Sequence, residues 1–267
     1  MSEALESTFQ RTVDDGYVRL TRTWPSLLAT GVVGGIDVGM GVLALLLVDH
    51  VTHRPLLGAL AFGIGFIALT LANSELFTEN FLVPVAAVAA RDASVLQLLR
   101  LWLGTLAANL AGAWVLMGLV VAGFPAVRAT AVELAAHPAS QALDLRTLAN
   151  MVVAGSVITL MTWMERSTES VPGKLVAAVA AAFLLAAGPM DHAIVVSIEM
   201  FAGLHAGATF GYARWAGFLG WAILGNVLGG LGLVTVLRMV QVGGGVLREE
   251  QDREPGEPRD EPAEGTA

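Results

Sequence analysis

The chain contains no cysteine, which excludes disulfide bonds, thiolate nucleophiles and thiolate metal sites. It is also poor in charge, because 14% of its residues are charged compared with about 25% in a typical soluble domain. Hydrophobic residues make up 55% of the sequence, and the mean hydropathy is +0.67. No signal peptide is expected, because the first residues are polar and end in Arg19, Arg22 and Trp24. This composition indicates an integral membrane protein.

Six stretches with little or no charge are long enough to cross a bilayer, which takes about 20 apolar residues. They cover residues 25–48, 55–74, 101–127, 147–164, 175–190 with a continuation to about 205, and 215–237. Polar residues interrupt the second and the fifth stretch. The sequence therefore predicts an all-α membrane protein with six transmembrane helices, of which the second and fifth are broken.

The remaining residues divide the chain into three regions. Residues 1–22 are predicted to form an amphipathic helix on the cytoplasmic surface, with Leu5, Phe9, Val13 and Val18 roughly on one face. Residues 23–242 are expected to form the six-span transmembrane domain. Residues 243–267 are expected to be a disordered acidic tail, since eight acids face three arginines from position 248 onward. The tail is either a solubilising extension or a docking segment.

Basic residues favour the cytoplasmic side of a membrane protein. A cytoplasmic N-terminus places eight of them on that side, in addition to the three arginines of the tail, and four on the other. The eight are Arg11, Arg19, Arg22, Arg91, Arg100, Arg166, Lys174 and Arg238, and the four are Arg54, Arg128, Arg146 and Arg214. We therefore expect a multi-pass protein of the cell membrane with both termini in the cytoplasm.

The fifth span is broken where Gly188 and Pro189 are followed by Asp191 and His192. Ionisable groups at membrane depth are costly and usually face a pore or a protein interior. Broken backbone is tolerated at that depth only where it is buried or lines a cavity. An imidazole changes its charge near neutral pH. His192 is therefore the leading candidate for substrate chemistry, with a packed structural histidine as the alternative.

The two halves of the chain echo each other. Trp102 precedes Asn109 in the third span, and Trp215 precedes Asn226 in the sixth, with each asparagine standing before a pair of small residues. Because each half has three spans, the second half must insert upside down relative to the first. Paired broken segments in an inverted repeat indicate a substrate path near the middle of the bilayer.

Four motifs together resemble the formate/nitrite transporter family, over about residues 8–240. They are Glu75-Leu76-Phe77-Thr78 in the first break, Asn150 in the fourth span, Asp191-His192 in the second break, and residues 225–230 of the sixth span. The resemblance implies an aquaporin-like protomer in a homopentamer, with one pore in each protomer. It implies small monovalent anions of weak acids as substrates, with the lipid bilayer as surroundings. No enzymatic activity, cofactor or nucleic-acid partner is expected.

The resemblance also assigns pore residues. Thr78 matches a threonine that lies beside the family's central histidine, and His192 matches that histidine. Leu76 and Phe77 match the adjoining apolar constriction. Further constriction residues are expected, from spacing alone, at Phe62, Phe66, Val153 and Leu185. The residues expected to support the broken helices are Asp191, which would accept backbone N–H groups, and Glu75, Asn109, Asn150 and Asn226.

Three features depart from the family pattern. Val196 stands where many members have an asparagine, and Glu79 follows Thr78 where a small residue is more usual. The loop before the fourth span lacks a lysine, and its nearby cations are Arg128 and Arg146. The chain therefore resembles a divergent member, and the substrates of the best-known members cannot be assigned to it. A pore-inactive scaffold that binds a partner through the acidic tail remains an alternative.

The transport hypothesis rests on the cost of dehydrating an ion. An unpaired anion loses its hydration in an apolar constriction, whereas the neutral form of a weak acid has less to lose. We expect His192 to donate a proton or a hydrogen bond to the anion, which requires a passage to His192. Asp37 in the first span either caps a helix distortion among glycines or joins a proton path.

Other functional classes have little support. A serine hydrolase that pairs Ser156 with His192 needs glycine two residues before and after the serine, where Ala154 and Ile158 stand. An aquaporin needs an Asn-Pro-Ala triplet, which neither break contains. The other histidines, His50, His53, His137 and His205, are scattered, so no metal site is predicted.

Overall fold

The computed structural model describes residues 3–252, and all regular structure in this part of the chain is helical. The helices of the first half are α1 (Glu3–Thr21), α2 (Trp24–Thr52), α3 (Pro55–Ala72), η1 (Phe77–Phe81), α4 (Val83–Ala89), α5 (Val95–Gly123) and η2 (Pro125–Val127). Those of the second half are α6 (Arg128–Ser140), α7 (Leu145–Arg166), α8 (Val171–Ala187), α9 (Ala193–Ala206), α10 (Tyr212–Val227), η3 (Leu228–Thr235), α11 (Val236–Val242) and α12 (Gly244–Gln251). Of these, η3 is a π-helix.

The chain is a multi-pass membrane protein. Four helices, α2, α3, α5 and α7, are long and apolar enough to cross a bilayer, as is the continuous stretch from α10 to α11. The apolar helices α8 and α9 are each too short to do so alone and follow one another across the second break. Together they supply the remaining pass. Six passes with interruptions in the second and fifth therefore describe residues 3–252, as the sequence predicts.

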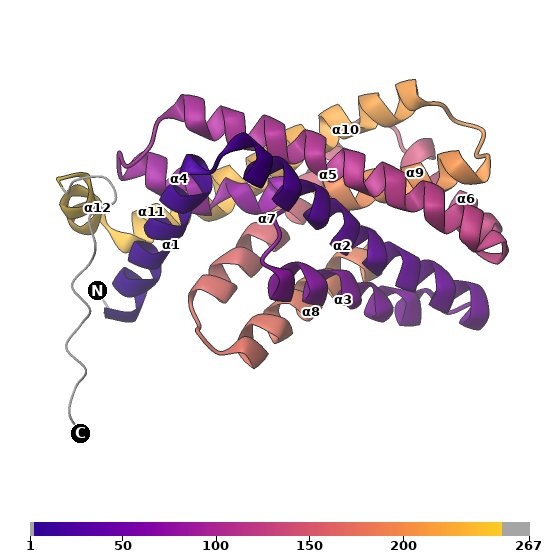
Figure 1. Cartoon of the computed structure of the whole chain (residues 1–267), viewed down its shortest axis with the longest axis horizontal. Coiled ribbons are helices and arrows are strands. Elements are labelled where there is room, and N and C mark those ends of the chain that lie inside the picture. The colour runs from indigo at the N-terminus through magenta and orange to yellow at the C-terminus, as the bar shows by residue number, and fades with distance from the viewer. Residues whose placement is uncertain (1–2, 253–267) are drawn as a thin grey trace.

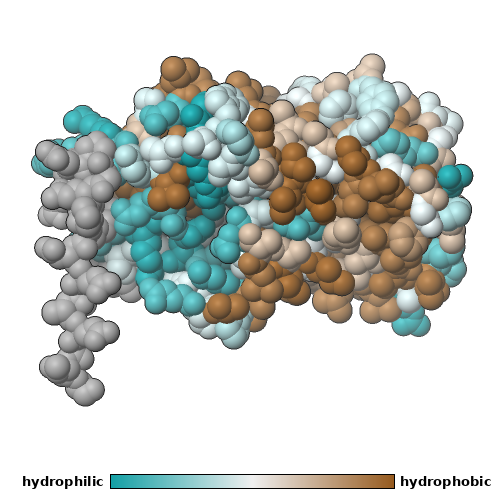
Figure 2. All heavy atoms as spheres, in the orientation of Figure 1, coloured by the Kyte–Doolittle hydropathy of each residue, from teal (hydrophilic) through white to brown (hydrophobic). Residues whose placement is uncertain are grey.

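The molecule has two distinct ends. Helices α1, α11 and α12 lie at one end of its long axis and α6 lies at the other (Figure 1). Hydrophilic residues gather near the α1 end, whereas hydrophobic residues cover much of the middle and of the opposite half (Figure 2). We call these ends the α1 side and the α6 side.

Local backbone chemistry produces both breaks. Helix α3 ends at Ala72 because Asn73 adopts a left-handed conformation with φ of 52°. Helix α8 ends at Ala187, before Gly188 and Pro189. Proline has no N–H group and disfavours helical geometry in the residue before it, so the helix cannot continue. Helix α9 then starts after His192, which occupies its N-cap position.

An asparagine in the third pass holds the first break. The side-chain N–H groups of Asn109 donate to the carbonyl oxygens of Gly31 and Glu75 at 2.7 and 2.9 Å. Its side-chain oxygen accepts the backbone N–H of Phe77 at 2.8 Å. Backbone polar groups need partners when they are buried away from water. Asn109 therefore joins α2 to both sides of the broken segment.

Asn226 makes the corresponding contacts in the second half. It donates to the carbonyl oxygens of Met151 and Asp191 at 2.8 and 3.2 Å, and it accepts the backbone N–H of Ala193 at 2.8 Å. Asp191 follows Glu75 by 116 residues, as Ala193 follows Phe77. The same three contacts thus recur at a nearly constant offset, which is the geometric signature of the predicted inverted repeat.

Glycines allow the backbones to approach closely at matching places in the two halves. Among the glycines whose added Cβ atom would overlap a carbonyl oxygen of a neighbouring pass, four form matching pairs in the two halves. The pairs are Gly35 with Asn109 and Gly112 with Val32 in the first half, and Gly155 with Asn226 and Gly229 with Val152 in the second. Small residues at such crossings are typical of packing in lipid.

The tryptophans that precede the two asparagines are not equivalent. Trp102 donates its indole N–H to the carbonyl oxygen of Asn80 at 2.8 Å and so supports the first break. The indole nitrogen of Trp215 is buried without a hydrogen-bond partner among the described residues. The predicted echo therefore holds for Asn109 and Asn226 and not for the tryptophans.

Helix α1 packs against α4 rather than lying free, and its buried residues include Phe9, Val13 and Leu20. Val18, which was predicted on the apolar face, is 57% exposed. A helix turns by about 100° per residue, so Leu20 continues the face of Phe9 and Val13 and Val18 points away. The prediction of Val18 as a buried-face residue is therefore wrong.

The acidic tail begins with a helix. Residues 244–251 were predicted to be disordered and instead form α12, in which Val246 packs into the same apolar cluster as Phe9 and Val13. The Gln251 side chain donates to the Ala89 carbonyl oxygen at 2.8 Å. The prediction of disorder rested on the acidic composition of the whole tail, and it overlooked Val246 and Leu247, which pack against the apolar cluster. Residues 253–267 of the predicted tail lie outside the described residues.

Replacing Asn226 with leucine is expected to lower the free energy of unfolding by about 2–4 kcal/mol, since unpaired buried backbone groups cost about 1–3 kcal/mol each. Thermal unfolding in mild detergent measures the loss. Asn226→Asp should lose at least as much, because a carboxylate accepts the Ala193 N–H but cannot donate to the carbonyl oxygens of Met151 and Asp191. A leucine variant as stable as the unmodified protein would contradict the assigned role.

Candidate functional site

His192 and Thr78 meet inside the protein, where the two broken segments come together. The Nε2 atom of His192 lies 2.6 Å from the Oγ1 atom of Thr78. Both side chains are completely buried. Their positions in the sequence are 114 residues apart, one in each half of the repeat. The structure thus brings together the two residues that the family resemblance places side by side.

The second ring nitrogen of His192 indicates the direction of this hydrogen bond. Nδ1 accepts the backbone N–H of Val195 at 3.4 Å and caps the start of α9. A neutral imidazole carries its hydrogen on the nitrogen that is not accepting. We therefore assign the Nε2–H tautomer, with His192 donating to Thr78. The hydroxyl hydrogen of Thr78 then remains as a donor for a bound anion.

Apolar side chains enclose this pair. Phe62, Phe66, Leu76, Phe77 and Leu185 are all buried and belong to one hydrophobic cluster. The rings of Phe62 and Phe66 pack edge to face with their centroids 5.5 Å apart. Five of the six residues predicted to constrict the pore therefore gather in the core.

Val153 is not part of this cluster. Its side chain is 48% exposed and lines an apolar pocket between α7 and η3, together with Val157 and Leu233. Ala154 and Ile158, which are four residues apart and fully buried, form the face of α7 that joins the core. The prediction of Val153 from spacing is wrong by one residue, because one residue along a helix turns the side chain by about 100° away from the core. Ile158 is the more suitable candidate.

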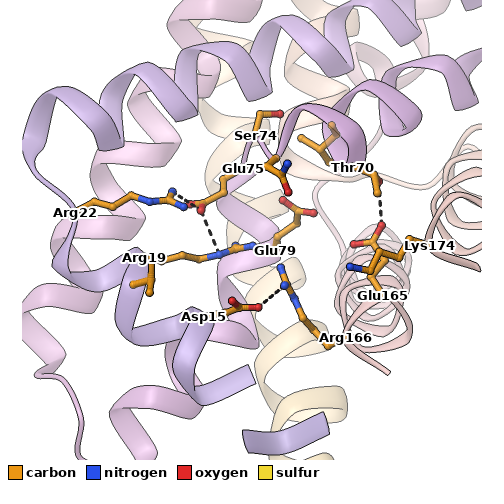
Figure 3. A pocket seen from close by; sticks show the side chains of 13 residues that line it. Asp15, Arg19, Arg22, Thr70, Ser74, Glu75, Glu79, Glu165, Arg166 and Lys174 are labelled. Atoms are coloured by element: carbon orange, nitrogen blue, oxygen red, sulfur yellow. Dashed lines mark hydrogen bonds and ion pairs between the residues drawn. The ribbon is translucent and has the colours of Figure 1, made fainter. Parts of the chain in front are cut away.

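A polar cavity of about 160 Å³ opens on the α1 side. Its charged lining comes from α1, the first break, α7 and α8, whose side chains converge in Figure 3. The acids are Asp15, Glu75, Glu79 and Glu165, and the bases are Arg19, Arg22, Arg166 and Lys174. Leu69 also lines it, next to the apolar cluster.

Ion pairs cross the opening of this cavity. Arg19 lies with its Nε atom 3.2 Å from a carboxylate oxygen of Glu75, which also pairs with Arg22. Arg166 pairs with Asp15 of α1. Glu75 was predicted to support the first break, and its ion pair with Arg19 joins this break to α1. These contacts of Arg19 and Arg22 were not predicted from the sequence.

A second cavity, of about 510 Å³, opens on the α6 side. Its lining includes His137, Gln141, Asp144, Arg146 and Asn150, together with Gly188 and Pro189, which follow the end of α8. The backbone N–H of Thr147 bonds Asp144 and holds the pKa of that carboxyl below its ordinary value. Asp144 therefore stays ionised beside Arg146 at ordinary pH.

Two residues of this cavity lining, Asn150 and Gln141, bond Asp191 in the second break. Asn150 accepts the backbone N–H of Asp191 at 2.7 Å, in keeping with its predicted support of a broken helix. The Asp191 carboxylate accepts the side-chain N–H of Gln141 at 3.1 Å, and its other oxygen is buried without a partner among the described residues. The expected backbone N–H bonds to this carboxylate are therefore replaced by Gln141, which the sequence analysis did not single out.

The other residues considered from the sequence have local partners. Asp37 accepts the hydroxyl hydrogen of Ser74 at 2.6 Å, and Ser74 lines the α1-side cavity. Ser156 donates to the Val152 carbonyl oxygen at 2.9 Å, so the described structure does not pair it with His192. No group of three histidine, aspartate or glutamate side chains within residues 3–252 has the spacing to hold a metal ion.

The passage to His192 is closed. Neither cavity includes His192 or Thr78 in its lining, and a water-sized probe reaches neither side chain. The expectation of an open passage is therefore not met in this conformation. The reason is packing, because five apolar side chains join one buried cluster and line neither cavity: Phe62, Phe66, Leu76, Phe77 and Leu185.

The sequence matches the model of the formate/nitrite transporter family over residues 6–240. It is 26% identical over 243 residues to the inner membrane protein YfdC of Escherichia coli (strain K12), covering 85% of this chain and 76% of that protein. It is 25% identical over 244 residues to the uncharacterized transporter YrhG of Bacillus subtilis (strain 168), covering 85% of this chain and 89% of that protein.

Two solved structures share the fold. An FNT family ion channel superimposes with a TM-score of 0.80 at 18% identity, covering 88% of this chain and 98% of that one. A pentameric formate channel with formate bound superimposes with a TM-score of 0.65 at 20% identity, covering 82% of this chain and 97% of that one. At such low identity these likenesses establish the architecture.

Proposed function

The chain belongs to the formate/nitrite transporter family, and we propose that it conducts small monovalent anions of weak acids, such as formate or nitrite, across a membrane. One observation carries the proposal: the hydrogen-bonded pair of His192 and Thr78 lies buried between two polar cavities that open at opposite ends of the molecule. A pair of polar side chains enclosed by apolar residues is suited to receive a small polar solute.

The proposed path has two apolar barriers. Leu76 and Phe77 separate the α1-side cavity from the histidine, since Glu75 lines that cavity. Leu185 lies on the other side, three residues before Gly188 of the α6-side cavity. Phe62 and Phe66 complete the enclosure. Small movements of these side chains would open the path, because they are held by apolar packing.

Protonation provides a way across these barriers. A monovalent anion in an apolar constriction loses its hydration, whereas the protonated weak acid enters without a net charge. In the proposed mechanism Thr78 donates a hydrogen bond to the anion. His192 first takes up a proton and becomes an imidazolium, then gives one proton to the anion and returns to the neutral imidazole. His192 is recharged from the next solute or from water. Transport is then linked to protons without any covalent intermediate.

We place the α1 side in the cytoplasm and propose a homopentamer. The orientation is supported by the excess of basic residues on the α1 side. The assembly is supported by the pentameric relative and by exposed apolar side chains on the passes, including Leu60, Ile64, Leu103 and Leu119. Native mass spectrometry in mild detergent should give a mass of five chains, and a monomer or dimer would contradict the proposed assembly.

Flux measurements in proteoliposomes test the proposed function. Formate, nitrite and other small monovalent anions should exchange across the membrane, and the flux should rise as the pH falls, because more of each acid is then neutral. Liposomes without protein give the background. No flux above this background for any anion of the panel, at either acidic or neutral pH, would favour a pore-inactive scaffold.

A further inference from the structure

Glu79 occupies a distinctive place between the α1-side cavity and the buried pair. It lies in η1, directly after Thr78, and only 5% of its surface is exposed. One carboxylate oxygen accepts the backbone N–H of Leu76 at 2.9 Å. The side chain also lines the α1-side cavity. Glu79 therefore faces the α1-side cavity and also bonds the backbone of Leu76, the first residue of the apolar barrier.

The other charges that face Glu79 are largely engaged. Arg19 of α1 bonds both Glu75 and the Asn80 side chain, with Arg19 lying 2.9 Å from the Asn80 oxygen. Arg22 adds a second cation to Glu75, and Arg166 pairs with Asp15. Glu165 of α7 accepts the Thr70 hydroxyl at 3.0 Å. Lys174 of α8 completes the set around the cavity (Figure 3).

Protonation of Glu79 changes the charge of this cavity. Its lining has four acids and four bases, so the fully ionised cavity is neutral overall. A proton on Glu79 leaves the cavity with one net positive charge. Because the cavity is small, a single charge alters its attraction for an anion strongly. A proton on Glu79 thus both attracts an anion and stands ready to neutralise it.

We propose that Glu79 is the proton-exchange group on the α1 side of the transport path, an inference that rests on the function proposed above. On exit through the α1 side, the neutral acid gives its proton to the Glu79 carboxylate and leaves as an anion. In the reverse direction the Glu79 carboxyl gives its proton to an arriving anion, which passes Leu76 and Phe77 as a neutral acid. Water in the cavity restores the starting state in each direction.

Thr78 couples this group to the centre of the path. The two residues are adjacent in η1, and Thr78 accepts the hydrogen bond of His192. A solute that passes the Leu76 barrier therefore leaves Glu79 and meets Thr78 and His192 next. In this scheme Glu79 exchanges protons with the α1 side, and His192 does so inside the apolar cluster.

The test compares Glu79→Gln with the unmodified protein in proteoliposomes loaded with formate. Glutamine keeps an oxygen for the Leu76 N–H but exchanges no proton at working pH. We expect flux to fall by about 10-fold to 100-fold, the scale of one lost acid–base group. Flux should also respond less steeply to α1-side pH than in the unmodified protein, because the protonation of the solute is then the remaining source of that dependence. Glu79→Asp should restore part of both.

Glu133→Gln is the matched control, because Glu133 is an exposed carboxylate on α6 and lines neither cavity. Its flux and pH dependence should equal those of the unmodified protein. If the unmodified protein is active and Glu79→Gln has the same rate and pH profile, the inference about Glu79 is overturned and the proposed function stands. Inactive unmodified protein overturns both. If Glu79→Gln does not fold, Glu79→Ala is measured in its place, and an unaltered rate and pH profile in that variant overturns the inference.

Discussion

Replacement of His192 with alanine is expected to reduce formate flux about 100-fold, the scale of a single proton-transfer group. The imidazole of His192 lies within hydrogen-bond distance of the Thr78 hydroxyl. Without it, the anion enters the apolar cluster with no proton donor, and the cost of its dehydration remains. Stopped-flow measurement of formate efflux from proteoliposomes gives the rate.

Alanine also removes the cap of α9, so a second variant separates transport from stability. Asparagine at position 192 keeps an acceptor for the Val195 N–H and cannot transfer a proton at working pH. His192→Asn should therefore approach the unmodified protein in unfolding temperature while losing as much flux as His192→Ala. Normal flux in a correctly folded His192→Asn variant would contradict the role assigned to the imidazole.

Replacement of Gly229 with alanine is expected to destabilise the protein by about 3 kcal/mol, the upper end of the usual cost of overpacking. An added Cβ would overlap the Val152 carbonyl oxygen and crowd the Ser156 hydroxyl. Backbone atoms on both sides have little freedom to move, because Asn226 ties α10 to α7 nearby. Thermal unfolding in detergent and the yield of folded protein measure the effect.

Gly232 is the matched control for this substitution. It belongs to the same π-helical segment, η3, and an added Cβ there meets nothing within 4 Å. Gly232→Ala should therefore be neutral or slightly stabilising, since alanine restricts the unfolded chain more than glycine does. Equal unfolding temperatures for the two alanine variants would show that the crossing of η3 and α7 is looser than described.

The breaks and their asparagine supports were predictable because their causes are local. The Gly188-Pro189 pair disfavours continuation of a helix through its own backbone chemistry, and polar residues after Ala72 mark the other break. Asn109 and Asn226 stand out as amides within apolar passes, where buried backbone groups need partners. The contact of His192 with Thr78 came from the family resemblance, since no local pattern relates residues 114 positions apart.

Features that depend on rotation or docking could not be predicted in this way. Val153 and Ala154 are both small and apolar, and only the helix packing decides that Ala154 faces the core. The pairing of Arg19 with Glu75 requires α1 to dock beside the first break. Gln141 reaches Asp191 from the loop after α6, and its sequence context carries no sign of that contact.

The central claim is that a proton crosses with each anion, because the path neutralises the solute between its two cavities. Simultaneous recording of formate efflux, internal pH and membrane current in proteoliposomes tests it most directly. A proton-coupled path gives formate efflux with matching proton loss and no net current, and both the efflux and the proton loss fall to background in His192→Asn. A sustained formate current without proton movement, undiminished in that variant, would contradict it.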